Sequence, residues 1–172
     1  PLGADQLPDF VQPLKVVDQG YRVVYEPEAL LKEEALSDGG SEFSMRVRVS
    51  LRALWALKDM KHLMNPAGDP IFAWQLISHK LLRYAAFAPM VTLALAAIYL
   101  APEKGFYALA ATGYALFLYL AWSGHKKENE GQALSTLYAL PYYFMLLNLA
   151  SFQAFVAFSK GEKKVIWNPR KG

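Results

Sequence analysis

Residues 84–123 read YAAFAPMVTLALAAIYLAPEKGFYALAATGYALFLYLAWS, and the only charged side chains among them are Glu103 and Lys104. Because a helix needs about 20 apolar residues to cross the hydrocarbon of a bilayer, the stretch predicts two membrane-spanning helices, 84–101 and 105–123. Helices that are apolar on all sides are stable in hydrocarbon and not in water. The alternative, buried core helices, requires more surrounding protein than a chain of 172 residues can provide. The stretch therefore predicts an integral, multi-pass membrane protein.

A third apolar segment, 132–159, is also long enough to cross, but the charges that flank the segments disagree with a simple third crossing. Basic residues precede the first span and follow the second and third segments: Lys80, Arg83, His125, Lys126, Lys127, Lys160, Lys163, Lys164, Arg170 and Lys171. Cytoplasmic loops are enriched in Lys and Arg, so three crossings would put the basic tail on the wrong side. One solution is that Pro141 breaks the third segment, which then bends back or lies in the interface.

The composition of the whole chain limits its function. Hydrophobic residues make up 54%, and 18 Lys and Arg against 15 Asp and Glu give a net charge of +3. That charge is too small to suggest nucleic acid as a partner, so we expect the basic residues to face membrane lipids or phosphate groups. The chain has no cysteine, which excludes disulfides and thiolate metal sites. It begins at Pro1 and its first residues read as the middle of a domain, so we expect a fragment.

The first 41 residues predict the last part of an α/β domain. Apolar residues at helical spacing predict a helix over 9–19 that stops at Gly20. The sequence YRVVY over 21–25 then predicts a short, buried strand. A helix, a glycine and a strand in this order are typical of an α/β layer fold.

The next region, 42–83, predicts helices at the membrane interface. From Glu42 to about Met64, apolar residues alternate with Arg and Lys. Such a helix can lie among lipid headgroups with its guanidinium groups facing phosphate. The whole chain is therefore expected to be mostly α-helical and to have four parts: 1–41, 42–83, the transmembrane region 84–159 and the basic tail 160–172.

The order of the motifs resembles the membrane-bound glycosyltransferases of family 2, which include synthases of cellulose, chitin, hyaluronan and poly-N-acetylglucosamine. Residues 1–29, PLGADQLPDFVQPLKVVDQGYRVVYEPEA, resemble the segment around the catalytic aspartate. Residues 44–57, SMRVRVSLRALWAL, resemble the Gln-x-x-Arg-Trp helix at the membrane interface. Residues 75–83, QLISHKLLR, resemble the stretch before the C-terminal membrane helices, and the tail KGEKKVIWNPRKG resembles the family's tail. The likeness covers nearly the whole chain.

The resemblance implies that the complete enzyme is an inverting transferase of the cell (inner) membrane, with its catalytic part in the cytoplasm. It would move a sugar from a nucleotide-sugar donor to a saccharide or lipid-linked acceptor. Residues 1–41 would then end a GT-A-like catalytic domain in which Asp9 is the base. Arg48, with Arg52 and Arg46, would face the pyrophosphate, and Arg48 and Arg52 share a helix face. Mg²⁺ or Mn²⁺ would be bound by residues outside this chain, so we expect the fragment to be inactive alone.

Other interpretations of these residues stay open. Asp9 alone is also typical of a helix N-cap, and Asp5 is the competing acid if the register differs. Pro8 stands where the family has an acidic residue, and Met45 and Val49 stand where it has glutamine and tryptophan. These departures leave a non-catalytic membrane anchor or assembly subunit as the alternative function.

Two further side chains have a functional and a structural interpretation. Trp55 is the nearest substitute for the missing tryptophan, on which an acceptor sugar would stack. His79 has no second ligand at a spacing that suits a metal ion, so we expect it to pack or to lie at the interface.

Overall fold

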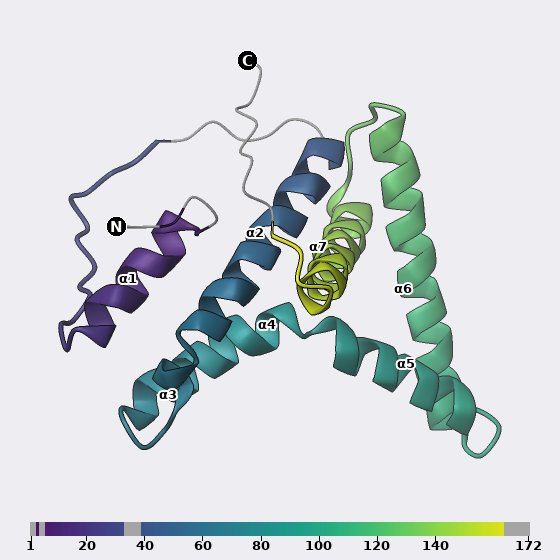
Figure 1. Ribbon diagram of the computed structural model, residues 1–172. Helices are drawn as coiled ribbons and strands as arrows, with labels where there is room; N and C mark the ends of the chain where they lie inside the picture. Colours follow the sequence, from purple (N-terminus) through teal and green to yellow (C-terminus); the bar gives the residue numbers. More distant parts are fainter. Residues whose placement is uncertain (1–2, 4–5, 33–38, 164–172) are drawn as a thin grey trace. The chain divides into compact units, whose positions relative to one another are not determined.

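The computed structural model describes residue 3, residues 6–32 and residues 39–163, and this part of the chain is mostly helical (Figure 1). It forms two compact units, Pro1–Arg83 with Gln153–Gly172, and Tyr84–Phe152. The last turns of the third apolar segment thus belong to the unit that contains the N-terminal residues.

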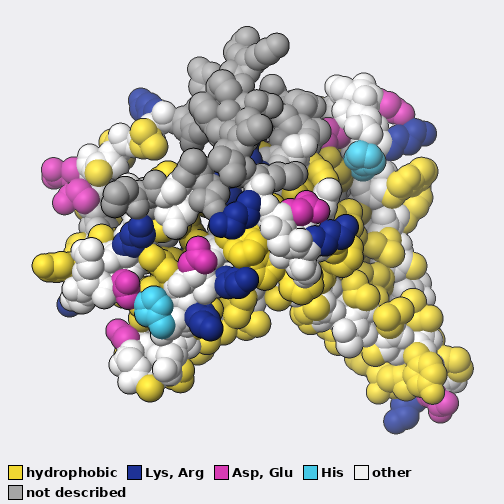
Figure 2. All heavy atoms as spheres, in the orientation of Figure 1, with side chains coloured by type: hydrophobic (Ala, Val, Ile, Leu, Met, Phe, Trp, Pro, Cys, Tyr) yellow, Lys and Arg dark blue, Asp and Glu magenta, His cyan; other side chains and the backbone are white. Residues whose placement is uncertain are grey.

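The second unit contains α5 (Phe87–Leu100), α6 (Gly105–Asn129) and the first part of α7 (Thr136–Ser159). Both α6 and α7 are long and apolar enough to cross a membrane, and a third crossing would need the broken pair Pro70–Tyr84 and α5 to act as one span. In Figure 2 the charged side chains of this unit gather at the two ends of α6, and hydrophobic side chains cover the stretch between them. The prediction of two to three long apolar helices is therefore confirmed.

The proposed break at Pro141 is wrong. The helix α7 runs from Thr136 to Ser159 with Pro141 inside it. A proline removes one backbone N–H donor from the hydrogen-bond ladder of a helix. Pro141 is the sixth residue of α7, so the helix lacks one hydrogen bond in its second turn and continues as a helix to Ser159.

The helices α6 and α7 form a hairpin and approach closely at Gly124. A Cβ atom built on Gly124 would lie 2.8 Å from the carbonyl oxygen of Tyr138 and 2.8 Å from the Cβ of Tyr142. One turn further along α6, the hydroxyls of Tyr142 and Tyr143 both donate to the carboxylate of Glu128, the second at 3.0 Å. A glycine contact and a shared carboxylate therefore hold this end of the hairpin together.

The first unit is built around α2. Its largest fully buried side chains are Leu51 of α2 and Val11 of α1, and α1 packs against α2. The elements of this unit, besides the end of α7, are α1 (Pro8–Asp18), α2 (Gly39–Asp59), η1 (Lys61–Met64), α3 (Pro70–Leu76), η2 (Ile77–Leu81) and α4 (Leu82–Tyr84).

The predicted basic helix is present, but it is shorter and more buried than expected. It ends at Asp59, and a separate 3-10 turn covers the rest of the predicted range to Met64. Five consecutive residues, 50–54, are all buried. Five residues cover more than one turn, so this part of α2 is enclosed on every side and presents no arginine face to lipid.

The predicted strand over 21–25 is absent, and the structure shows no strand in the part of the chain that it describes. The segment has no regular structure and is exposed, with Val24 at 81% and Tyr25 at 85% of full exposure. A strand forms only when its backbone N–H and C=O groups pair with a neighbouring strand. The described residues provide no such neighbour, so the α/β part of the predicted fold class is not confirmed.

Candidate functional site

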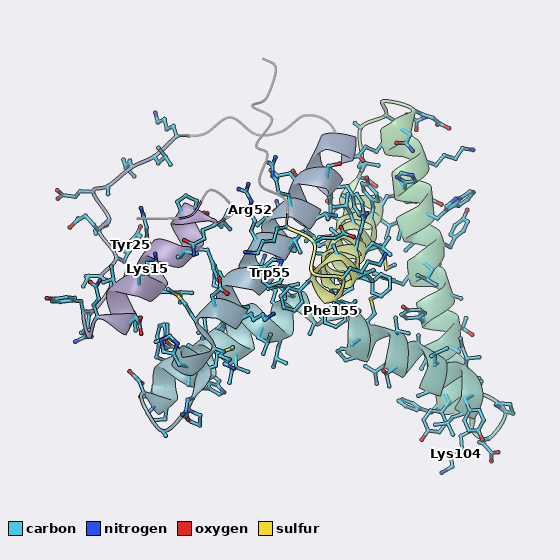
Figure 3. The ribbon with its side chains drawn as sticks, viewed as in Figure 1. Lys15, Tyr25, Arg52, Trp55, Lys104 and Phe155 are labelled. Atoms are coloured by element: carbon cyan, nitrogen blue, oxygen red, sulfur yellow. The ribbon has the colours of Figure 1, made fainter. Side chains whose placement is uncertain are left out.

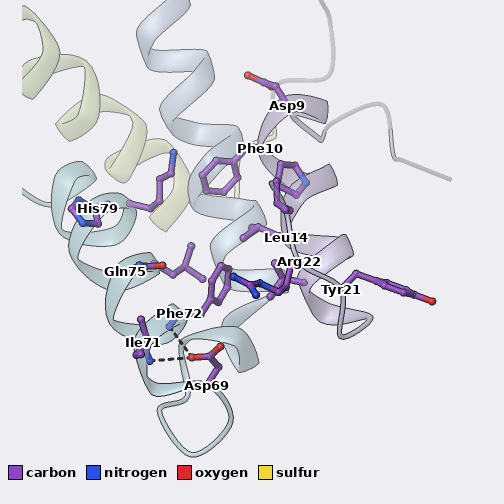
Figure 4. A pocket seen from close by; sticks show the side chains of 15 residues that line it. Asp9, Phe10, Leu14, Tyr21, Arg22, Asp69, Ile71, Phe72, Gln75 and His79 are labelled. Carbon is purple, nitrogen blue, oxygen red and sulfur yellow. Dashed lines mark hydrogen bonds between the residues drawn. The ribbon is translucent and has the colours of Figure 1, made fainter. Parts of the chain in front are cut away.

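A pocket of about 600 Å³ lies in the first unit, between α1 and the continuous helical stretch of α3 and η2 (Figure 4). Residues 21–23, which follow α1, complete its wall. The lining side chains are those of Asp9, Phe10, Pro13, Leu14, Val17, Tyr21, Arg22, Val23, Asp69, Ile71, Phe72, Gln75, Leu76, His79 and Lys80.

Helical spacing explains why these residues meet. On α1, Phe10, Leu14 and Val17 follow each other at four and three residues, so they share one face. On the opposite wall, Phe72 and Leu76 are also four residues apart. Both helices thus give an apolar face to the pocket, and the polar residues lie around it. An apolar cavity with a few polar groups is the usual form of a small-molecule site.

The charged residues of the pocket are in different situations. Asp69 is the N-cap of α3, and its Oδ1 accepts the backbone N–H groups of Ile71 at 3.1 Å and Phe72 at 3.0 Å (Figure 4). The ammonium of Lys80 lies 5.2 Å from the ring centre of Phe10. Figure 4 shows Arg22 directed into the pocket. Asp69 thus has a structural role, whereas Arg22 and Lys80 supply positive charge beside an apolar surface.

Asp9 lies at the end of the pocket opposite Asp69 (Figure 4). It is exposed, and no hydrogen bond or ion pair joins its carboxylate to any residue that the structure describes. The N-cap of α1 is Leu7, without a side-chain cap, and Pro8 is the first helical residue. The interpretation of Asp9 as an N-cap is therefore wrong, and its carboxylate is available to a ligand. The competing acid, Asp5, lies outside the described residues.

The three predicted phosphate-binding arginines lie on α2, and none of them lines the pocket. Arg46 is paired with Glu42 one turn earlier, with 2.6 Å between its Nε and the carboxylate. Arg52 is buried and interacts with another residue. Arg48 is half-buried. The structure thus does not bring Asp9 and these arginines together in one cavity.

Trp55 does not form an open platform for a sugar. Its ring packs edge-on against Phe158 of α7, with ring centres 4.8 Å apart, and its indole N–H donates to the carbonyl of Glu162 at 2.9 Å. The ammonium groups of Lys58 and Lys163 lie 4.6 Å and 5.1 Å from the ring centre. Figure 3 shows Trp55 beside the end of α7. The ring is therefore engaged in packing within the first unit.

Arg22, Lys80 and Gln75 were not predicted as site residues, although all three line the pocket with Asp9. His79 was expected to pack or to lie at the interface, and its ring lies 6.0 Å from Trp74 and also in the pocket wall. A signal was present, because GYR follows the first helix, and in QLISHK the residues His79 and Lys80 lie four and five positions after Gln75. Only the fold could show that these two segments face each other.

No group of three or more His, Asp or Glu side chains in the described part of the chain converges on a point where a metal ion could bind. The donors in the pocket therefore do not suit Mg²⁺, which needs a set of oxygen ligands. Comparison of the chain with protein-family models, with curated protein sequences and with solved structures gives no match.

Proposed function

We propose that this chain is the acceptor-side and membrane part of an inverting, nucleotide-sugar-dependent glycosyltransferase that extends a polysaccharide or glycolipid. The observation that carries the proposal is the free carboxylate of Asp9 at a pocket that also holds Arg22 and Lys80. The order of the sequence motifs supports the same assignment. The long apolar helices α6 and α7 support a location in the cell (inner) membrane, and we place the catalytic part on the cytoplasmic side.

The proposed chemistry needs a base and a positive environment. An acceptor hydroxyl attacks the anomeric carbon of the donor, the bond from that carbon to the nucleoside diphosphate breaks, and the hydroxyl proton passes to the Asp9 carboxylate. A carboxylate without a protein partner can take this proton, whereas the Asp69 carboxylate already accepts two backbone N–H groups. The apolar faces around Phe10 and Phe72 would exclude water from the acceptor hydroxyl.

The leaving nucleoside diphosphate carries negative charge, which cations stabilise. Arg48 is the α2 arginine that we assign to it, with Arg52 and Arg46 as its neighbours. Arg22 and Lys80 are the cations of the pocket itself. Residues in the rest of the complete enzyme would bind Mg²⁺ or Mn²⁺, and the transfer of the proton to Asp9 does not involve the metal.

The test is Asp9→Asn in the complete, membrane-embedded enzyme. General-base catalysis contributes roughly 10²–10⁴-fold, so we expect sugar transfer to fall by that factor while binding of the nucleotide is retained. Asp59→Asn is the matched control, because Asp59 is an exposed acid at the end of α2 that does not line the pocket. Unchanged turnover in Asp9→Asn would remove this residue from the mechanism.

A non-catalytic membrane anchor is the second candidate, and the covered ring of Trp55 together with Met45 and Val49 favours it. The two functions differ in one measurable product. Membranes that carry the intact protein should release nucleoside diphosphate from a nucleotide sugar when Mg²⁺ or Mn²⁺ is present. Membranes that show no release above a control without the protein would favour the anchor.

A further inference from the structure

The helix α5 is too short to cross a membrane by itself. It has 14 residues, which at about 1.5 Å per residue give a length of about 21 Å. The hydrocarbon core of a bilayer is about 30 Å thick. The helix α6, with 25 residues, reaches about 37 Å by the same measure. The preceding helices are separated from α5 by a turn at Ala85 and Ala86, so they do not extend it as one straight rod.

The end of α7 lies in the same compact unit as α2 and contacts it directly. Phe158 packs on Trp55 at 4.8 Å between ring centres, and the carbonyl of Glu162 accepts the Trp55 indole N–H at 2.9 Å. Lys58 of α2 also lies over both rings, at 4.6 Å from Trp55 and 5.7 Å from Phe158. Arg83 and Lys160 therefore belong to one unit, and a unit that lies on one side of the bilayer requires an even number of crossings between them.

From these observations we propose that only α6 and α7 cross the bilayer, and that α5 is held in a single leaflet on the side of α2. Both ends of α5 and the C-terminal tail then lie on the side of the bilayer that carries α2. The turn between α6 and α7 lies on the opposite side. The partner of α5 is the acyl layer of that leaflet. This topology does not depend on the proposed transferase activity.

The exposed surface of α5 fits a lipid environment. Large apolar side chains stand out on several faces of the helix: Val91, Leu93, Leu95, Ile98 and Tyr99. Only Ala94 is buried among the residues of α5. A helix with one face against protein would show an apolar stripe, whereas this one is apolar all round, as hydrocarbon requires. Lys104 marks its far end, at the turn into α6 (Figure 3).

The basic residues agree with two crossings and not with three. With two, the side of α2 carries eight Lys and Arg next to the spans, and the other side carries Lys126 and Lys127. The eight are Lys80, Arg83, Lys104, Lys160, Lys163, Lys164, Arg170 and Lys171. With α5 as a third crossing, the side of α2 would keep only Lys80 and Arg83 of these eight and would gain Lys126 and Lys127. Lys and Arg concentrate on the cytoplasmic side, so two crossings put all parts of the first unit there.

The topology can be tested directly because the chain has no cysteine. Single variants Ala67→Cys, Glu103→Cys, Gln132→Cys and Lys160→Cys each carry one thiol at an exposed position. Right-side-out membrane vesicles containing the full chain are treated with a membrane-impermeant maleimide, before and after detergent. Ala67→Cys reports the side of α2. We expect Glu103→Cys and Lys160→Cys to give the same labelling as Ala67→Cys in vesicles. Gln132→Cys should be labelled when these three are protected, and protected when they are labelled.

Each other pattern overturns the proposal. If Gln132→Cys behaves like Ala67→Cys while Glu103→Cys and Lys160→Cys behave oppositely, then α5 crosses. If all four behave alike, neither α6 nor α7 crosses. A fifth variant, Leu95→Cys, tests the leaflet itself, because its side chain is exposed in the protein. Leu95→Cys should not react with the maleimide in vesicles and should react in detergent. Reaction in vesicles would show that α5 lies in water.

Discussion

The close approach of α6 and α7 at Gly124 predicts opposite effects for two glycine substitutions on the same helix. A Cβ at Gly124 would lie 2.8 Å from both the Tyr138 carbonyl oxygen and the Tyr142 Cβ, whereas a Cβ at Gly113 would meet no atom within 4 Å. Alanine favours a helix over glycine by roughly 0.5–1 kcal/mol. Both variants gain this amount, but only Gly124→Ala forces two helices apart, at a cost of about 1–3 kcal/mol for an overpacked contact.

The difference between Gly113→Ala and Gly124→Ala therefore isolates the packing term, because the propensity term is common to both. We expect Gly113→Ala to be slightly more stable than the parent chain and Gly124→Ala to be less stable than Gly113→Ala by about 1–3 kcal/mol. The measurement is the free energy of unfolding of the full chain in detergent, by titration with a denaturing detergent. Equal stabilities for the two variants would show that α6 and α7 do not meet at Gly124 and would refute the hairpin contact.

Two further changes test hydrogen bonds of single carboxylates. Glu128→Gln should lower stability by roughly 1–3 kcal/mol, because bonds to a charged group are stronger than bonds to an amide. Glu130→Gln is the control: this exposed carboxylate accepts from the Gln132 amide and lies 3.9 Å from the Lys126 ammonium, and exposed ion pairs contribute at most about 1 kcal/mol. Equal effects of the two substitutions would contradict the sharing of the Glu128 carboxylate by Tyr142 and Tyr143. Asp69→Ala should lower the free energy of unfolding by about 0.5–2 kcal/mol through loss of the α3 cap. Asp69→Asn should keep most of this stability, because asparagine is also a good N-cap residue. Thermal unfolding of the parent chain, Asp69→Ala and Asp69→Asn measures this loss. If Asp69→Asn loses as much stability as Asp69→Ala, capping is excluded as the cause.

The helices were predictable because their patterns are local. The uncharged runs before and after Glu103 place both ends of α5 and the start of α6 within three residues of their observed bounds, whereas α6 continues six residues beyond its run, to Asn129. The number of crossings was not predictable in the same way. Hydropathy treats 84–101 and 105–123 alike, yet α5 is shortened by the turn at Ala85 and Ala86. The conflict between the basic tail and three crossings was visible in the sequence, but no local pattern distinguishes a break at Pro141 from a first segment that is too short to cross.

The predicted strand over 21–25 is absent for the opposite reason, because a strand depends on pairing with a distant segment and not on its own sequence alone. YRVVY has the β-branched and aromatic composition of a strand, but composition reports only how well a segment would fit a sheet. Pairing decides the outcome, and the partner must come from elsewhere in the fold. The burial of Arg52 was unpredictable on similar grounds, since an arginine on an amphipathic helix is normally exposed.

The order of two residues separates the structural aspartate of the pocket from the one proposed to be catalytic. In Asp69-Pro70 the proline is the first residue of α3, so the aspartate before it is the N-cap and its carboxylate accepts two backbone N–H groups. In Pro8-Asp9 the order is reversed, and the proline again starts the helix. Asp9 is then already inside the first turn, where its side chain has no capping role. Pro8, at the first position of α1, thus leaves the Asp9 carboxylate without a capping bond, as its proposed role as a base requires.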